Sequence, residues 1–501
     1  MTDDAFAKAQ PGFDTFRVGF EEGEPQLVYR RFVGDLETPL SAYLKLTGDA
    51  PGSFLLESVE GGDQLARYST IGMDPDIVWT CKDNHAQLLD EKGQVLESGQ
   101  DALAALRKLT EASRTPMLRE VELDLPPMAS GLFGYFAYDF VRYVEHLPNR
   151  PDDDLALPDA YLVRPRVVAT FDSVKREVVL VTTVRPLNEQ TAEQAYQEAE
   201  ARLEALLDQL RAPLTAPHGG PTPMPNFQSN MASQEYIGAV QQAKEYIRAG
   251  DVFQVVLSQR YSADYTGQAL DAYRQLRRIN PSPFLFYLNF EPATLLGASP
   301  EILVRVRNGE VTIRPIAGTR PRGATPDEDI ALEKELLADK KERAEHLMLL
   351  DLGRNDVGRS AKLGSVKPVE TFVIERYSHV MHISSDVRGT LKKGLTPLDA
   401  MLNGFPAGTL TGAPKIRAME IIDELEHSAR GPYGGAIGYF GADGEFDSCI
   451  GLRMAVVKDG KVHVQAGAGV VYDSDPQAEL QECEAKSAAI KQAFMRAAQG
   501  S

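Results

Sequence analysis

The spacing of apolar positions changes character near the middle of the 501-residue chain. Residues Leu187–Leu210 repeat apolar side chains at helical spacing and predict a long amphipathic helix. The segment that follows, Ala212–Ser229, contains five prolines, which deprive helices and inner strands of backbone donors. We therefore predict a first part over residues 1–211, a linker over 212–229 and a second part over 230–501.

The second part opens with a predicted helix, Ser233–Ala249, capped by Ser233, and then alternates short β-rich runs with Gly, Pro and Asn. The predicted strands cover Phe253–Gln259, Phe284–Asn289, Thr294–Gly297, Ile302–Arg307 and Val311–Ile316. One long helix is predicted over Asp329–Asp351, and another from Asp475, with Pro476 in its first turn, to Arg496. A block of strands with helices beside it predicts an α+β fold, an antiparallel β-sandwich flanked by helices.

Composition and charge exclude several classes of protein. Hydrophobic residues make up 43% and charged residues 25%, which is typical of globular chains. The net charge of −19 repels phosphate backbones and anionic membranes, so a nucleic-acid partner is not expected. There is no apolar run long enough to span a membrane, and Met1–Gln10 does not have the pattern of a signal peptide. Three widely separated cysteines predict no disulfide framework and favour a reducing cytoplasm.

Two predicted helices each carry a pair of glutamates on one face. Glu342 and Glu345 are three residues apart, as are Glu479 and Glu482. If the two faces oppose each other, the carboxylates would suit Mg²⁺, which prefers oxygen ligands. Two solvated helix faces would show the same spacing, so spacing alone leaves both interpretations open.

Single residues add candidate chemistry without deciding it. His379 and His382 are near each other but lack a zinc pattern, so a proton-transfer role suits one of them better, and an ordinary structural histidine is the alternative. Arg453 lies in the apolar, strand-like run Ser448–Val457. A guanidinium there needs a partner, which is either a structural carboxylate or a carboxylate of the substrate.

Two glycine-rich turns could expose backbone amides to an anion. They are Gly408–Lys415 and Gly467–Gly469. The first lacks the GxxxxGK[ST] pattern of a phosphate-binding loop, so nucleotide binding is excluded there. Plain structural turns remain the alternative for both.

Taken together, these segments resemble the chorismate-utilising enzymes, and most closely the large components (component I) of anthranilate synthases. The resemblance is continuous over Asn226–Arg496 and thinner before it. Its densest segments are Asp251–Ser258, Gly297–Glu301, Arg314–Arg320, Ala344–His346, Leu352–Asp356 and Gly408–Lys415, with Leu55–Ser58 and Arg67–Ser69 in the first part.

The resemblance implies a role for each matching position. It implies Mg²⁺ as cofactor, with Glu345 and Glu482 as ligands and Glu342 and Glu479 supporting the metal waters. His382 matches a general acid/base, for which we expect a pKa near 6.5. The remaining implied catalytic residues are Thr409, Glu301 and Gln254, and the implied substrate-binding residues are Tyr433, Arg453, Gly467, Gly469, Lys486 and Gly318.

Two positions choose among the relatives. Gln254 stands where the water-adding members have a lysine base, and Ala317 stands where aminodeoxychorismate synthases commonly have a nucleophilic lysine. The resemblance therefore implies a lyase that converts chorismate and ammonia to anthranilate and pyruvate. The alternatives are an enzyme that releases 2-amino-2-deoxyisochorismate without elimination, and a catalytically silent tryptophan-sensing module.

The resemblance also implies a partner and an inhibitor. None of the cysteines lies on a glutaminase nucleophile turn, so a separate glutamine amidotransferase subunit (component II) is expected to supply ammonia. Feedback inhibition by tryptophan is expected in the first part. The implied tryptophan site consists of Leu56, Glu57, Ser58, Pro283, Phe284 and Leu285.

Overall fold

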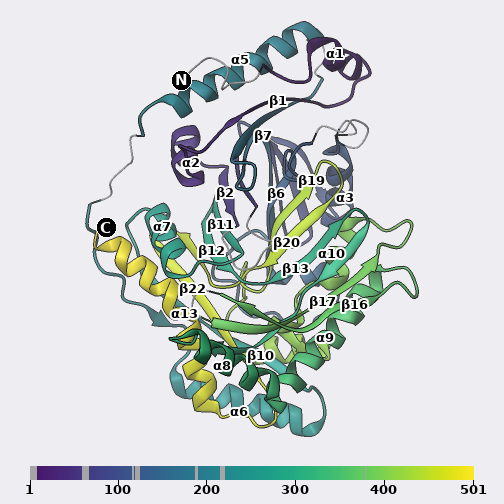
Figure 1. Cartoon of the computed structure of the whole chain (residues 1–501). Coiled ribbons are helices and arrows are strands. Elements are labelled where there is room, and N and C mark those ends of the chain that lie inside the picture. Colours follow the sequence, from purple (N-terminus) through teal and green to yellow (C-terminus); the bar gives the residue numbers. More distant parts are fainter. Residues whose placement is uncertain are drawn as a thin grey trace.

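In this computed structural model, the described residues are 8–58, 67–115, 118, 124–186, 190–214, 220–377 and 380–500. The strands lie at the centre of the molecule and the helices surround them (Figure 1). Helices α1 and α5 cover strand β1 at the top of this view, and α6, α8 and α13 lie at the bottom. This arrangement, with antiparallel strands flanked by helices, confirms the predicted α+β class.

Strands dominate the first part of the chain. Its elements are α1 (Phe13–Glu21), β1 (Gln26–Val33), α2 (Pro39–Thr47), β2 (Ser53–Glu57), β3 (Tyr68–Lys82), β4 (His85–Asp90), β5 (Val95–Gln100), α3 (Ala102–Ala112), β6 (Gly131–Phe136), the 3₁₀ helix η2 (Tyr138–Tyr143), β7 (Ala160–Asp172), β8 (Glu177–Val184) and α5 (Ala192–Arg211). The predicted helix before the linker is confirmed as α5, where Thr191 accepts a hydrogen bond from the backbone of Gln194.

The second part alternates strands with helices. Its elements are β9 (Gln228–Ser229), α6 (Ser233–Ala249), β10 (Gln254–Asp264), α7 (Ala269–Ile279), β11 (Phe284–Asn289), β12 (Thr294–Ser299), β13 (Ile302–Arg307), β14 (Glu310–Ile313), β15 (Ile316–Pro321), α8 (Pro326–Ala338), α9 (Lys340–Ser360), β16 (Lys367–Arg376), β17 (Val380–Thr390), α10 (Pro397–Gly404), α11 (Gly408–Thr411), β18 (Gly412–Ala413), α12 (Lys415–Leu425), β19 (Ala436–Gly441), β20 (Phe446–Ile450), β21 (Met454–Lys458), β22 (Lys461–Val470) and α13 (Pro476–Ala498).

Two arms of sheet branch from the long antiparallel pair of β3 and β7. One arm continues from β3 through β2, β11, β12, β21 and β22 to β10. The other continues from β7 through β6, β19, β20, β13 and β14 to β17. Side chains of both arms, such as Phe54, Phe286, Phe133 and Tyr439, share one buried cluster. The two arms therefore face each other as the layers of a sandwich.

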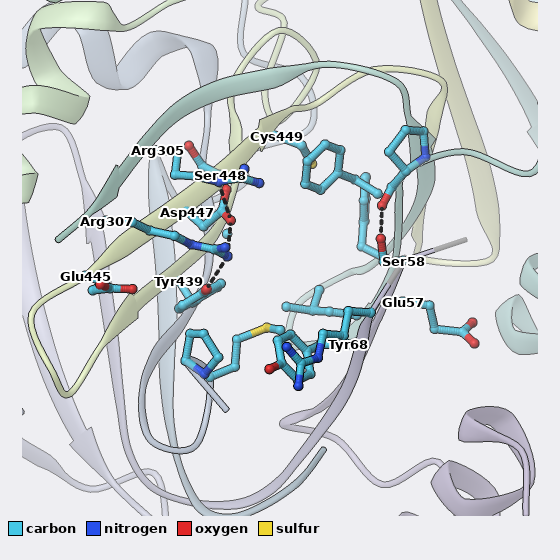
Figure 2. Close-up of a pocket in the computed structure, with 18 of the residues that line it drawn as sticks. Glu57, Ser58, Tyr68, Arg305, Arg307, Tyr439, Glu445, Asp447, Ser448 and Cys449 are labelled. Carbon is cyan, nitrogen blue, oxygen red and sulfur yellow. Dashed lines mark hydrogen bonds and ion pairs between the residues drawn. The ribbon is translucent and has the colours of Figure 1, made fainter. Parts of the chain in front are cut away.

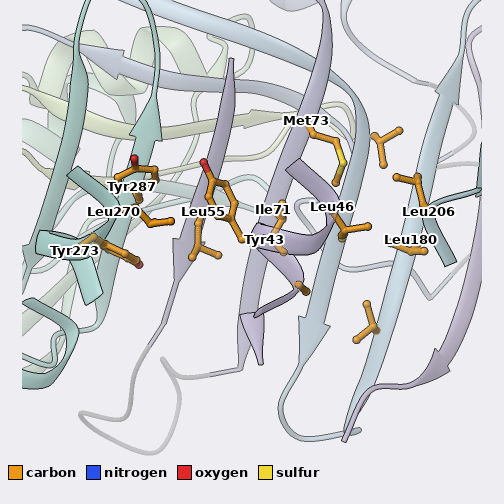
Figure 3. Close-up of a cluster of buried hydrophobic side chains, with 14 of the residues drawn as sticks. Tyr43, Leu46, Leu55, Ile71, Met73, Leu180, Leu206, Leu270, Tyr273 and Tyr287 are labelled. Atoms are coloured by element: carbon orange, nitrogen blue, oxygen red, sulfur yellow. The ribbon is translucent and has the colours of Figure 1, made fainter. Parts of the chain in front are cut away.

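Helices cover the outer faces of these layers. Figure 3 shows part of one outer core, in which Tyr43 and Leu46 of α2 lie near Leu55 of β2 and Ile71 of β3. The same cluster includes Tyr287 of β11 and residues of α5, α7 and α13. Helices α10 and α12 contribute to a second cluster on the other arm, and α6, α12 and α13 to a third beside β10. The burial of apolar surface in these cores is the main favourable term holding the helices to the sheet.

The two predicted parts share the sheet. Strand β2 pairs with β11, so Leu56 lies opposite Phe286, and β6 pairs with β19. Of the predicted linker, the structure describes 212–214 and 220–229, and its last two residues form β9 beside β10. The division of the chain at 212–229 stays a prediction. The strand pairs β2–β11 and β6–β19 join the two predicted parts in one sheet.

Four local predictions were wrong in detail. The strand predicted over Val311–Ile316 is interrupted between β14 and β15. The helix predicted over Asp329–Asp351 is divided into α8 and α9, because Asp339 is extended and its side chain accepts backbone bonds from the first turn of α9. Helix α6 has Ala232 at its N-cap, whose N–H donates to Glu235, so Ser233 lies inside the helix. The run containing Arg453 breaks between β20 and β21, and Arg453 has a φ of 45°.

Within the residues that the structure covers, we find no helix with the length and apolar character needed to cross a bilayer. The helix that comes nearest in length, α13, carries charged residues from its first turn to its last. Its buried side chains, such as Leu480 and Phe494, instead pack against the sheet and neighbouring helices.

Candidate active site

The two predicted glutamate pairs lie on α9 and α13. Glu342 is in the first turn of α9 with Glu345 one turn later, and Glu479 and Glu482 occupy the first two turns of α13. The carboxyl of Glu345 is close enough to Glu342 and Glu482 for both charges to act on it. The first two turns of both helices therefore bring Glu345 within electrostatic range of Glu482.

The electrostatics of this cluster fit a cation. Burial raises the pKa of Glu345, and the like charges of Glu342 and Glu482 raise it further. Burial also raises the pKa of Glu479. The carboxylate of Glu482 pairs with Lys486 at 2.7 Å, and that of Glu342 with Arg320 at 3.4 Å. Mg²⁺ prefers hard oxygen ligands such as carboxylates, and its positive charge would offset the repulsion between these glutamates.

The carboxylates are near one another without forming a ready-made coordination shell. Among the described residues, no group of three or more His, Cys, Asp or Glu side chains is arranged so that it could hold a metal ion. Two of the four carboxylates form ion pairs with the chain itself, Glu482 with Lys486 and Glu342 with Arg320. The magnesium site stays a prediction, for which the residues present are chemically suitable.

Glu301 and Thr409 meet across two distant segments. Glu301 lies between β12 and β13, and Thr409 is on the short helix α11. The hydroxyl of Thr409 donates to Glu301 Oε1 at 3.1 Å. Burial raises the pKa of Glu301 to about 8, against the lowering effect of the Thr409 bond and of Lys486 and Arg453. Glu301 is therefore protonated at neutral pH in the free protein and can itself donate a hydrogen bond.

His382 is a buried imidazole on β17. Its Nδ1 lies 2.9 Å from the carbonyl oxygen of Gly318 and 3.1 Å from Thr319 Oγ1. A carbonyl only accepts, so Nδ1 carries the proton and Nε2 is left as a base. Burial lowers the pKa of His382 to about 4. The expected value near 6.5 was wrong, because the ring is desolvated and also feels the positive charges of Arg453 and Lys486.

Arg453 has the chemistry of an anion-binding residue. It follows β20, with its guanidinium buried enough for desolvation to lower its pKa. Among the described residues, no carboxylate forms an ion pair with its side chain and no side-chain hydrogen bond reaches it. Of the two partners considered for Arg453, the structural carboxylate is therefore not found in this part of the chain. A buried guanidinium without an anion is poised to receive one from a ligand.

The glycines and Tyr433 line the backbone beside β10. A Cβ added to Gly469 would lie 2.6 Å from Gln254 Nε2, and one added to Gly467 would lie 3.0 Å from the hydroxyl of Tyr433. The carbonyl of Gly467 accepts a bond from Lys486 at 3.1 Å. Glycine at both positions thus leaves backbone groups open beside polar side chains. Burial raises the pKa of Tyr433, which keeps its hydroxyl protonated as a donor.

Gly318 and Gln254 connect the remaining groups. Gly318 has a φ of +67°, and a Cβ there would lie 3.1 Å from Glu342 Oε2. Its carbonyl holds His382, so this one residue joins the imidazole to the glutamate cluster. Gln254 Nε2 lies 3.5 Å from Glu345 Oε1. The ten catalytic and substrate-binding positions predicted from the resemblance and the four glutamates are thus linked by short contacts or mutual electrostatic effects. The neighbouring His379 lies outside the described residues.

The predicted tryptophan-site residues gather around a second cavity. It has a volume of about 1060 Å³, at the upper end of small-molecule sites, and it lies between the two arms of the sheet. All six predicted residues line it. Ser58 donates to the carbonyl of Pro283 at 3.0 Å, which ties the first part to the second (Figure 2). The roles of these residues stay predictions.

One of these side chains points elsewhere. Glu57 turns away from the cavity (Figure 2) and accepts bonds from Tyr273 at 2.7 Å and Arg277 at 2.8 Å on α7. The opposite wall carries Arg305 and Arg307, both paired with the buried Asp447. Sequence reasoning missed this polar wall, because alternating polar residues on β13 and β20 have the same pattern as a solvated strand face.

Comparison with known proteins identifies the family of the chain. The profile of the chorismate binding enzyme family matches residues 60–492, which include the four glutamates and His382. The chain therefore belongs to the chorismate binding enzymes.

Within that family, the chain is similar in sequence to proteins named anthranilate synthase component 1, as the resemblance implied. The chain is 52% identical over 489 residues to anthranilate synthase component 1 of Cereibacter sphaeroides, covering 96% of this chain and 97% of the relative. It is 48% identical to anthranilate synthase component 1 of Thermus thermophilus, covering 94% and 98%.

Solved structures agree in fold. Anthranilate synthase component I from Streptococcus pneumoniae superposes with a TM-score of 0.74 at 36% identity, covering 92% of this chain and 98% of that chain. The menaquinone-specific isochorismate synthase of Escherichia coli superposes with a TM-score of 0.70 at 18% identity, covering 96% and 98%. The second likeness shows the fold alone.

Proposed function

We propose that this chain is a magnesium-dependent lyase that adds ammonia to chorismate and eliminates pyruvate to give anthranilate. The buried side chain of Gln254 carries this proposal. Its amide nitrogen faces Glu345, and its Oε1 is buried with no hydrogen-bond partner in the described part of the chain. A neutral acceptor cannot deprotonate water at neutral pH, but it can orient an N–H donor such as ammonia.

The charges around the site suit a dicarboxylate substrate. In a chain of net charge −19, chorismate needs local cations at both ends. Arg453 and Lys486 supply positive charge on the chain itself, and Tyr433 can donate to a carboxylate oxygen. Mg²⁺ held by Glu345 and Glu482, with Glu342 and Glu479 around its waters, would neutralise a carboxylate as a Lewis acid.

We assign proton transfer to His382 and Glu301, whose pKa values are shifted far from the ordinary values of a histidine and a glutamate. His382 is neutral with Nε2 available as a base, and Glu301 is protonated beside Thr409. A base and an acid on one site can serve the two proton movements of amination and elimination. Ala317 on β15 has no nucleophile, which argues against a covalent intermediate there.

Ammonia is expected from a partner subunit. All three cysteines are buried, and burial raises the pKa of Cys81, Cys449 and Cys483 to about 12. A thiol held protonated in this way is a poor glutaminase nucleophile. We therefore infer that a glutamine amidotransferase subunit supplies ammonia, and that three free thiols fit a reducing, cytoplasmic setting.

The purified chain with chorismate and Mg²⁺ is expected to form anthranilate from ammonium salts and not from glutamine. The increase in anthranilate fluorescence measures the reaction, and mass analysis distinguishes anthranilate from 2-amino-2-deoxyisochorismate. Release of the aminated intermediate alone would favour the enzyme that lacks elimination. Chorismate binding without any turnover would favour the silent sensing module.

Tryptophan is proposed to bind in the cavity between the two arms and to inhibit the enzyme. Leu56 and Ser58 of the first part meet Pro283 and Phe284 of the second part there. A ligand at a contact between two segments can shift their relative positions, because it favours the arrangement in which it makes the most contacts. Strand β13 carries Arg305 at this cavity and begins at Ile302, directly after Glu301 of the active site, which offers a direct physical connection.

Replacing Ser58 with phenylalanine is expected to raise the tryptophan concentration for half-inhibition at least about tenfold, since a buried ring would fill the cavity and remove the hydroxyl. Rates with and without tryptophan, each normalised to the variant's own uninhibited rate, measure the effect. Ser98→Phe on β5 is the control, because Ser98 is exposed and contacts His85 outside the cavity. Unchanged sensitivity of the Ser58 variant would remove the cavity from the mechanism.

A further inference from the structure

A fully enclosed ion pair lies behind the active site. Arg430 and Glu426 are 3% and 7% exposed, and their side chains form two bonds, Nε to Oε2 at 2.9 Å and Nη2 to Oε1 at 2.5 Å. Placing two charges in the interior is costly unless all their bonding capacity is used. What Arg430 does with its remaining donors therefore indicates its purpose.

Those donors reach two backbone segments of the active site. Nη1 donates to the carbonyl of Leu410 at 2.6 Å, and Nη2 donates to the carbonyl of Val256 at 2.7 Å. Leu410 follows Thr409 on α11, and Val256 lies two residues after Gln254 on β10. One guanidinium thus sets the distance between the turn that carries Thr409 and the strand that carries Gln254. A lysine has one ammonium and no planar fork, so it cannot make both bonds with this spacing.

The same guanidinium packs against an active-site ring. Its carbon lies 5.8 Å from the centroid of Tyr433 and 4.7 Å from that of Tyr138 on η2. Cations over aromatic faces attract the ring, and the attraction strengthens when water is excluded. Tyr433 therefore has a fixed charged surface on one side, while its hydroxyl faces Gly467.

Glu426 extends the network to the glycines. Its Oε1 accepts from the backbone N–H of Ser258 at 2.7 Å and from the Ser258 hydroxyl at 2.9 Å. Ser258 lies opposite Gly467 in the sheet, and Val256 lies opposite Gly469. The ion pair thus contacts the backbone directly across from both glycines proposed to bind the substrate.

We propose that Arg430, held by Glu426, is the positioning residue that sets the mutual placement of Thr409, Gln254, Tyr433 and the Gly467–Gly469 strand around chorismate. This role rests on the proposed function of that site. Arg430 is not a catalytic residue. It contacts backbone carbonyls and the ring faces of Tyr138 and Tyr433, and it does not contact any atom that we propose to touch the substrate. Its effect is geometric, and errors of about 1 Å in such placement cost about 100-fold in rate.

Arg430→Lys tests the role, with Arg142→Lys as the matched control. Arg142 is also largely buried. Its Nη2 donates to both carboxylate oxygens of Asp423, its Nε donates to Asp139 and its Nη1 to the carbonyl of Asn149, and none of these partners is among the proposed active-site residues. Both variants lose a largely buried arginine–carboxylate pair, and both should unfold at a lower temperature. We expect kcat/KM for chorismate with ammonium to fall about 100-fold in Arg430→Lys, with kcat and KM both affected, and to stay within about twofold in Arg142→Lys.

Glu426→Gln provides a second variant if Arg430→Lys does not fold. It keeps an acceptor for Ser258 but weakens the hold on Arg430, and we expect about a tenfold fall in kcat/KM. Values within threefold of the unmodified chain for the variant that folds would overturn the proposal. Chorismate affinity, measured by calorimetry, distinguishes a failure of the proposed function from a failure of the positioning role of Arg430. A chain that binds chorismate without forming anthranilate refutes the proposed function, and affinity loss in Arg430→Lys but not Arg142→Lys still supports positioning.

Discussion

Replacing His382 with alanine is expected to slow anthranilate formation by about 10²–10⁴-fold, the usual contribution of a general acid or base. The imidazole has its Nδ1 proton bonded to Gly318, which leaves Nε2 as the only ring position that can accept a proton. Alanine removes that acceptor while leaving Arg453 and Lys486 in place. Chorismate affinity should therefore change little, and stopped reactions analysed by mass should show which step is blocked.

A matched histidine provides the control for this prediction. His463 on β22 also has its pKa lowered to about 4 by burial, and it bonds Ser262 at 2.8 Å at a distance along the strand from the active-site glycines. His463→Ala should keep most of the activity. If His382→Ala turned over at the rate of His463→Ala, His382 would have no role in proton transfer.

The same histidine makes a prediction for pH. A base with a pKa of about 4 is almost fully neutral at pH 6, and it loses its proton-accepting capacity only as the pH falls through 4. Rates divided by the concentration of free ammonia should therefore show no loss from His382 between pH 7.5 and pH 6. A histidine with a pKa of 6.5 would instead lose most of its basic form over that interval.

Replacing Glu345 with glutamine is expected to reduce activity by more than about 100-fold and to raise the Mg²⁺ concentration needed for half-maximal rate. The reason is that the carboxylate of Glu345 is buried and coupled to those of both Glu342 and Glu482. Even residues that only support a metal ligand typically cost 10–100-fold when removed. Binding of Mg²⁺ is measured independently by the shift that the ion produces in the thermal unfolding midpoint.

Glu484→Gln is the control for charge removal. Glu484 lies on α13 two residues after Glu482 and is exposed. This substitution therefore removes one negative charge from the second helix of the cluster without changing any of the four clustered glutamates. The Mg²⁺ requirement should be unchanged in this variant. Equal Mg²⁺ dependence in Glu345→Gln and the unmodified chain would exclude these carboxylates as the metal site.

Local sequence patterns predicted many of the elements well. Pro476 after Asp475 marked the start of α13, because a proline without a donor fits the first turn and an aspartate caps it. The same kind of signal was missed at Asp339, where a single capping side chain divides an otherwise continuous helical pattern. A cap inside a periodic run leaves the hydrophobic spacing almost unchanged, so periodicity does not reveal it.

Spacing predicted which glutamates share a face of one helix but not which helices face each other. Glu342 with Glu345, and Glu479 with Glu482, follow from 3.6 residues per turn. The approach of Glu345 to Glu482 depends on the tertiary fold, and the resemblance to known enzymes supplied that expectation. The pKa of His382 is a further case, since its shift comes from burial and from Arg453 and Lys486, which are remote in sequence.

The sequence by itself determined the α+β class, the helix faces, the residue types suited to a dicarboxylate and Mg²⁺, and the family to which those residues belong. Only the tertiary structure decided that Glu57 turns toward α7, that Arg453 has no carboxylate partner among the described residues, and that Arg430 connects Leu410 to Val256. The physical reason is range. Helical periodicity and capping depend on residues a few positions apart in the sequence. Desolvation, ion pairing and hydrogen bonds to distant backbone carbonyls depend on neighbours that only the folded chain brings together.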